Sequence, residues 1–208
     1  YCLDMTSEFS DLQGLISFYP SVLDEVKVIS NSVPAEPLQA GEFYNGVLYA
    51  QTLIYSEERM AYIPNLFVSV NIATGRRSPL GSVAGETKIV DMAYSYKDNV
   101  MYGIIIKNTG PTLVTIPLSG SNAGKPTDIG VIKGDPVRYA TLACHLSGQL
   151  YAIGVDGKLY KIDVDKLQAT AIGDTQVRIS DAPGEAIQNT QSLAFDHNTN
   201  TLYWSCED

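Results

Sequence analysis

The sequence predicts an all-β chain built from four-stranded antiparallel units that repeat about every 51 residues. Two patterns point to this fold. A short segment with an alanine, a polar turn and a Leu-Tyr or Met-Tyr pair recurs along the chain, and segments rich in alternating and β-branched residues follow each copy. No stretch as long as an average helix shows 3.6-residue periodicity.

The repeat is defined by its alanines and tyrosines. The alanines are spaced by 53, 50 and 51 residues, and the tyrosines by 48, 53, 49 and 52 residues. The alanines are Ala40, Ala93, Ala143 and Ala194, and the tyrosines are Tyr1, Tyr49, Tyr102, Tyr151 and Tyr203. Because chance seldom gives such even intervals, we interpret them as a true internal repeat.

Each unit is expected to contain four strands. The first strand surrounds the alanine, a turn such as Asn45-Gly46 follows, and the second strand begins near the tyrosine. The third strands are predicted at 15–18, 66–70, 113–116 and 159–162. The fourth strands carry Leu80-Gly81, Ile129-Gly130 and Ile172-Gly173.

Four-stranded units that repeat at this length are typical of a β-propeller. The alanine fits the crowded innermost strand of each blade. The predicted blade-like units span residues 1–33, 34–84, 85–133 and 134–190, and another begins at 191–208. A four-bladed ring would hold the second strand twice, so we expect part of a ring of six to eight blades.

Two segments carry a resemblance to known families. Residues 192–196 followed by Leu202-Tyr203-Trp204-Ser205 resemble the blade opening of YWTD, NHL and TolB-like propellers. Residues 150–153 and 157–163 are similar to blades of the quinoprotein-like group. The resemblance implies a ligand on the face opened by the fourth-to-first and second-to-third connections.

Acidic residues occur in each predicted fourth-to-first connection. They are Glu36, Glu86, Asp135 and Glu185. An arc of carboxylates at a channel mouth suits Ca²⁺ or a cationic partner. The alternative is that they are ordinary solvated turn residues.

Three further residues are candidates for ligand binding. Tyr55 and Tyr62 lie in a long predicted loop over 55–65, where their rings would stack on a sugar or peptide or pack on the sheet. His145 lies two residues beyond Ala143, so its side chain would either line the channel or have its hydrogen-bonding groups paired within the packed sheet.

Composition narrows the range of partners. The net charge of −9 disfavours nucleic acid, and no apolar run reaches the roughly 18 residues of a membrane span. Cys2, Cys144 and Cys206 form no zinc pattern. We expect them to be small buried hydrophobes, with a disulfide between two of them as the alternative.

Two functional classes remain open. We favour a noncatalytic binding or scaffold propeller, exported or displayed on a bacterial cell surface, that takes a protein, peptide or glycan. It would insert into no membrane and need no cofactor other than a possible Ca²⁺. The alternative is a lactonase- or lyase-like propeller enzyme whose channel acids hold a divalent metal.

Overall fold

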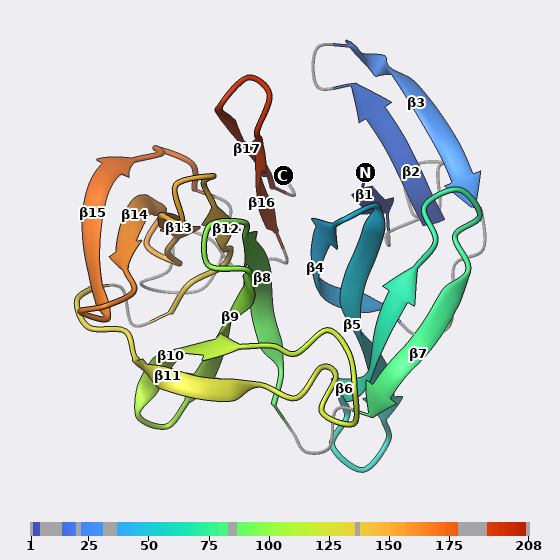
Figure 1. Ribbon diagram of the computed structural model, residues 1–208, viewed down its shortest axis with the longest axis horizontal. Coiled ribbons are helices and arrows are strands. Elements are labelled where there is room, and N and C mark those ends of the chain that lie inside the picture. Colours follow the sequence, from blue (N-terminus) through green and yellow to red (C-terminus); the bar gives the residue numbers. More distant parts are fainter. Residues whose placement is uncertain are drawn as a thin grey trace.

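The computed structural model describes residues 2–4, 14–19, 22–30, 37–82, 87–135, 138–178 and 191–206. All the secondary-structure elements in these ranges are β-strands, which agrees with the predicted all-β class (Figure 1). None of the described secondary structure is a helix long and apolar enough to cross a membrane.

The strands form five antiparallel sheets. A three-stranded sheet contains β1 (Cys2–Asp4), β2 (Gly14–Tyr19) and β3 (Val22–Ser30). The next sheet contains β4 (Leu38–Tyr44), β5 (Val47–Ser56), β6 (Ala61–Val70) and β7 (Arg77–Ser82). The third contains β8 (Ile89–Ser95), β9 (Val100–Lys107), β10 (Gly110–Thr115) and β11 (Thr127–Val131). The fourth contains β12 (Ala143–Cys144), β13 (Leu150–Ile153), β14 (Lys158–Asp163) and β15 (Gln168–Asp174), and a two-stranded sheet contains β16 (Ser192–Asp196) and β17 (Thr201–Ser205).

The sheets follow one another around a common centre in chain order, and β4, β8, β12 and β16 lie nearest that centre (Figure 1). Neighbouring innermost strands contact each other from β4 to β8, from β8 to β12 and from β12 to β16. The predicted third and fourth strands of the three complete sheets all occur as strands. The Asn45-Gly46 turn has φ angles of 50° and 79°, as a tight hairpin requires.

Four of the repeated tyrosines occupy equivalent places on the second strands, as predicted. Tyr102, Tyr151 and Tyr203 pair with Ala93, Ala143 and Ala194 on the first strands. Tyr49 instead pairs with Glu42, so Glu42 and not Ala40 is the counterpart of Ala93. The β4–β5 turn has only two residues, and Ala40 lies at a β-bulge with a φ of 54°.

The prediction that every repeat alanine is buried is wrong for two of the four. Ala93 and Ala143 are buried, whereas Ala40 is only partly buried and Ala194 is exposed. Ala93 packs against residues of the following sheet, and Ala143 packs near Leu193 of the β16–β17 sheet. No described sheet covers β16–β17 in the same way, so Ala194 stays open to solvent.

Two further expectations need correction. The segment 55–65 is not a long loop, because β5 and β6 continue as a ladder to a turn at 57–60. Cross-strand pairs such as Ile54 with Ile63 favour this continuation. The free thiol of Cys144 is buried as expected, but Cys206 is exposed. The side chain of Cys2 lies outside the described residues.

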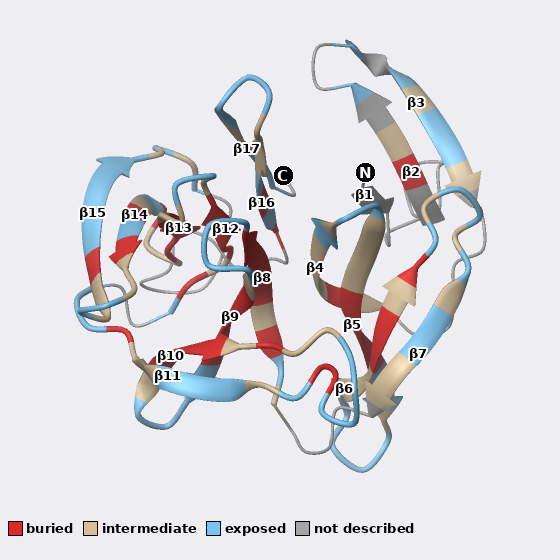
Figure 2. Cartoon of the chain, in the orientation of Figure 1, coloured by how far each residue is buried: buried red, intermediate tan, exposed pale blue. Residues whose placement is uncertain are grey.

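The core lies between the sheets rather than in one layer. Buried residues concentrate on β8, β9, β12 and β13, and exposed residues on the outer strands (Figure 2). Ile104 and Leu113 pack with Leu150 and Ile162 of the next sheet. Gln51 bridges the β4–β7 and β8–β11 sheets: its side-chain oxygen accepts the Ile89 amide at 3.0 Å, and its amide donates to the Thr87 carbonyl at 3.1 Å.

Ala143→Leu is expected to lower the free energy of unfolding by about 1–3 kcal/mol, because the larger side chain overpacks the interface with β16. The matched control is Ala194→Leu at the equivalent, exposed position, where the change should stay within about 0.5 kcal/mol. Urea denaturation of the two variants tests this difference. Equal losses would contradict the assigned packing.

Candidate functional site

Two acidic side chains near the centre join neighbouring sheets. Asp91 on β8 is 2% exposed, and its two oxygens accept the backbone amides of Met92 at 2.9 Å and Leu142 at 2.8 Å. Glu42 on β4 is partly buried and accepts the amides of Phe43 at 2.7 Å and Tyr94 at 3.2 Å. Each carboxyl group therefore ties its own strand to the next innermost strand.

Burial has the largest effect on the pKa values of Glu42 and Asp91. Loss of solvent raises the pKa of Glu42 to about 7, although its two amide donors act in the opposite direction. Burial also raises the pKa of Asp91 well above its ordinary value, and the nearby Glu42 adds to this. Both groups therefore bind a proton more tightly than a solvated carboxyl does.

The raised pKa of Glu42 predicts a pH-dependent stability. Its folded pKa of about 7 exceeds the ordinary 4.5, so its contribution is fully present below pH 4.5 and is lost as the pH rises through 7. We expect the free energy of unfolding to fall by about 2–3 kcal/mol between pH 5 and pH 8. The free energy of unfolding, measured by chemical denaturation at each pH, should fall less steeply with pH for Glu42→Gln than for the exposed control Glu57→Gln. Equal slopes would contradict the assignment.

Aromatic and histidine rings form a chain at the end of the molecule where first strands turn into second strands. This aromatic–histidine cluster consists of Tyr44, Tyr94, Tyr96, His145, Phe195 and His197. Tyr44 stacks on Tyr94 with ring centroids 3.7 Å apart, and Tyr96 contacts His197 edge-on at 5.5 Å. Phe195 contacts both His145 and His197. The cluster thus links four sheets around the centre.

The two histidines of the chain differ in their surroundings. His145 is hydrogen-bonded through Nδ1 to the Ser147 hydroxyl at 2.7 Å and through Nε2 to Asn200 Oδ1 at 2.5 Å. These bonds hold the turn after β12 against the turn between β16 and β17. Burial, and to a lesser extent His145, lowers the pKa of His197, whose buried Nδ1 has no hydrogen-bond partner among the described protein groups.

Cys144 lies directly before His145, but its thiol is not activated. Burial raises the pKa of this thiol to about 11, so it stays protonated at neutral pH. A reactive thiol needs a lowered pKa. The described side chains contain no group of three or more His, Cys, Asp or Glu residues placed to hold a metal ion.

Two clefts open on the same face as this cluster. The first, of about 320 Å³, lies between the β8–β11 and β12–β15 sheets, and the second, of about 470 Å³, between the β4–β7 and β8–β11 sheets. The second is lined by Tyr44, Tyr94 and the apolar side chains of Ile116 and Leu118, among others. Both clefts are formed by first-to-second and third-to-fourth turns, which meet at one end of an antiparallel sheet.

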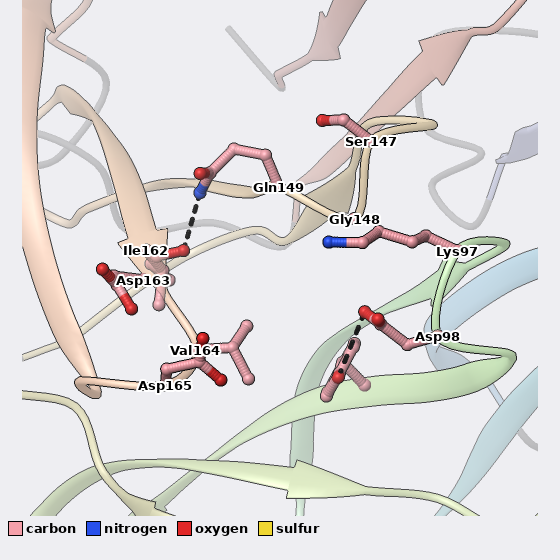
Figure 3. A pocket seen from close by; sticks show the side chains of 10 residues that line it. Lys97, Asp98, Ser147, Gly148, Gln149, Ile162, Asp163, Val164 and Asp165 are labelled. Atoms are coloured by element: carbon pink, nitrogen blue, oxygen red, sulfur yellow. Dashed lines mark hydrogen bonds between the residues drawn. The ribbon is translucent and has the colours of Figure 1, made fainter.

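The first cleft is acidic (Figure 3). Asp98, Asp163 and Asp165 line it together with one cation, Lys97. The Asp98 carboxylate accepts the Ser95 hydroxyl at 2.8 Å, and Asp163 pairs with Lys166 at 2.8 Å.

The walls of this acidic cleft are fixed by short contacts. Gln149 donates to the Ile162 carbonyl at 2.7 Å. A Cβ atom on Gly148, whose φ is 83°, would lie 2.8 Å from Lys97 Cδ. The two sheets therefore approach each other closely at this point.

The predicted site residues that the structure describes do not gather at one place. Glu36, Glu86 and Glu185 lie outside the described residues, and Asp135 is exposed in the connection before β12. Tyr55 and Tyr62 are directly opposite each other on β5 and β6, half exposed, with ring centroids 5.4 Å apart. His145 belongs to the aromatic–histidine cluster. The structure thus does not bring Asp135, the two tyrosines and His145 together.

A signal for the cluster was present in the sequence. Tyr94-Ser95-Tyr96 and Phe195-Asp196-His197 share an aromatic–polar–aromatic spacing, and Ser95 and Asp196 hold the same position before the hairpin turn. The acidic cleft has no such signal, because its acids come from turns more than 60 residues apart in the chain.

Comparison with known proteins identifies the fold and not a family. No protein-family model matches the sequence, and no curated protein gives a significant match. Solved structures with the same arrangement include one from a nidogen/laminin complex, with 12% identity and a TM-score of 0.53 over 88% of this chain. The fold is of the β-propeller type.

Two further propeller-like structures match. One is a gluconolactonase from Xanthomonas campestris, with 10% identity and a TM-score of 0.50 over 86% of this chain. The other is a protein of unknown function from Bacteroides thetaiotaomicron, with 14% identity and a TM-score of 0.50 over 81% of this chain. This chain covers 61%, 58% and 38% of the three matched chains, which is less than two-thirds of each. The resemblance to NHL and YWTD-like propellers therefore holds at the level of the fold.

Proposed function

We propose that the chain is a noncatalytic β-propeller domain that binds a basic segment of a protein partner in the acidic cleft. The observation that carries this proposal is the cleft itself, which is lined by three carboxylates and one lysine between two closely packed sheets, with Asp163 also paired to Lys166 beside it. The net charge of −9 would draw a cationic segment toward it over a longer range. We further propose, from the composition, that the domain acts outside the cytoplasm.

Polar groups near the centre already have hydrogen-bond partners within the protein, which supports a binding role rather than a catalytic one. The carboxyls of Asp91 and Glu42 are occupied by backbone amides, and the His145 ring is held by Ser147 and Asn200. These groups stabilise the contacts between sheets. Asp98 and Asp163 in the cleft also have partners, Ser95 and Lys166, but these carboxylates and that of Asp165 lie at turns at the surface, where a partner can reach them.

The expected ligand class follows from size and charge. The acidic cleft holds a volume of about 320 Å³, which suits one or two side chains of a partner rather than a folded domain. A lysine or arginine side chain matches carboxylates through charge-assisted hydrogen bonds. Exposed pairs of this kind are weakened by salt, so binding should fall with ionic strength.

A peptide of alternating lysine and glycine residues tests the proposal. We expect Asp163→Asn/Asp165→Asn to weaken its binding by about tenfold, because two attractive charges are removed. The matched control Glu57→Gln/Glu58→Gln removes two charges from the turn between β5 and β6, on the opposite face, and should change the affinity little. Fluorescence anisotropy in low and physiological salt measures both.

Two outcomes would contradict the acidic cleft as the binding site. One is a larger loss for the Glu57/Glu58 variant, which would favour the face opened by the second-to-third turns. The other is equal binding of a glutamate–glycine peptide, which would show that charge does not select the ligand.

A further inference from the structure

The two clefts lie on opposite faces of the β8–β11 sheet. On β9, Tyr102 lines the acidic cleft and belongs to the core shared with the β12–β15 sheet, whereas Met101 lines the second cleft and belongs to the core shared with the β4–β7 sheet. Successive side chains of a strand point to opposite faces. The exposed turn at 96–99 forms the ridge between the clefts, since Asp98 lines the acidic cleft and Asn99 lines the second.

The second cleft differs from the acidic cleft in its chemistry. None of the described residues that line it carries a charge, and its walls include the partly buried side chains of Tyr44, Val100 and Leu118. The hydroxyl of Tyr94 donates to the side-chain oxygen of Asn99, so the polar end of this ring is already paired. An apolar side chain that enters this cleft would leave water without leaving a charge unpaired.

The walls of the second cleft are held in place by the fold. The Ile116 amide donates to the Met101 carbonyl at 2.9 Å, and the Gly124 amide donates to the Pro117 carbonyl at 2.8 Å. These bonds fix the β10–β11 connection on one side, and the tyrosine pair stacked at 3.7 Å lies on the other. A preformed cleft needs little ordering when a ligand binds, so more of the contact energy appears as affinity.

The distance between the clefts sets the spacing of the ligand groups that would enter both. Packed sheets lie about 10 Å apart, so clefts on the two faces of one sheet are separated by roughly that distance. A polyproline II segment has about three residues per turn and rises about 3.1 Å per residue. Its side chains three positions apart therefore point the same way and lie about 9 Å apart. In a β-strand, side chains on one face lie about 7 or 13 Å apart, which fits less well.

We propose that the second cleft binds an apolar side chain of the same partner segment whose basic residue enters the acidic cleft. The partner is then a segment in polyproline II conformation that crosses the turn at 96–99, with a lysine or arginine and an apolar residue three positions apart; this rests on the proposed binding of a basic residue in the acidic cleft. The acidic cleft supplies an attraction that salt weakens, and the second cleft supplies apolar contacts that salt does not screen.

Three peptides with blocked ends test the spacing on the unmodified protein by fluorescence anisotropy. Leu-Pro-Pro-Lys-Pro-Pro-Leu places an apolar residue three positions from the lysine in both chain directions, and its prolines favour the required conformation. We expect it to bind about tenfold more tightly than Ser-Pro-Pro-Lys-Pro-Pro-Ser, because a leucine leaves water in the second cleft. The isomer Pro-Pro-Leu-Lys-Leu-Pro-Pro keeps the composition but places the leucines beside the lysine, and it should lose most of this advantage.

Variants of the protein locate the two contributions. Leu118→Ser should remove the advantage of the leucine peptide over the serine peptide, whereas the control Ile129→Ser, which removes an exposed apolar side chain on β11 outside both clefts, should keep it. Asp163→Asn/Asp165→Asn should weaken both peptides by a similar factor. Because Leu118 also packs on the core, each variant is judged by the ratio of its two affinities.

The outcomes separate this proposal from the one for the acidic cleft. Equal binding of the leucine and serine peptides, or of the two leucine isomers, would overturn the role of the second cleft while the loss in Asp163→Asn/Asp165→Asn still supported the acidic cleft. An advantage that survives in Leu118→Ser would also overturn it. Binding that neither Asp163→Asn/Asp165→Asn nor salt weakens would overturn the acidic cleft as the site, and the paired arrangement with it.

Discussion

Gly124→Ala is expected to destabilise the protein by about 3–5 kcal/mol. Gly124 has a φ of 75°, and a Cβ atom there would lie 2.1 Å from Cβ of Phe67, which is completely buried. Phe67 belongs to the β4–β7 sheet, whereas Gly124 belongs to the β10–β11 connection of the next sheet. The substitution would therefore force these two sheets apart.

Gly120→Ala is the matched control in the same connection. Gly120 has a φ of 78°, but its Cβ would meet nothing within 4 Å. Only the backbone strain applies there, so the expected loss is about 1–2 kcal/mol. Thermal denaturation of both variants separates the clash from the strain. A loss for Gly124→Ala no larger than that for Gly120→Ala would contradict the close approach of the two sheets.

Asp91→Ala should lower the free energy of unfolding by about 2–5 kcal/mol, because it leaves the buried amides of Met92 and Leu142 without an acceptor. Asp91→Asn keeps the shape and one acceptor oxygen, and its loss should be smaller. Urea denaturation at pH 5 and pH 8 measures both variants.

The pH comparison adds a second test of Asp91. Because burial raises its pKa, ionisation of Asp91 opposes folding, and its removal should cost less at pH 8 than at pH 5. An Asp91→Ala variant as stable as the parent at both pH values would show that this carboxyl does not join β8 to β12.

The sequence predicted strand order well and side-chain contacts between sheets poorly. The repeat tyrosines, the third strands and the Asn45-Gly46 turn follow from local spacing and turn chemistry, which a single chain displays directly. The equivalence of Glu42 and Ala93 was missed, because the β4–β5 turn is two residues shorter than the β8–β9 turn and the alanine count ignores turn length.

The acidic cleft could not be predicted from the sequence, for a different reason. Lys97 and Asp98 lie in one turn, Ser147 to Gln149 in a second and Asp163 to Asp165 in a third. Which turns meet depends on how the sheets pack around the centre, and the repeat period does not contain that information. The sequence did indicate one ligand face, but the clefts lie at the opposite end of the strands.

Hydrogen exchange with and without the lysine–glycine peptide tests the central claim, that the acidic cleft is the binding site. The account predicts slower exchange at the turns around Lys97-Asp98 and Asp163-Asp165, and no change at the Glu57-Glu58 turn. Protection confined to the Glu57-Glu58 turn, with none at the cleft, would contradict it.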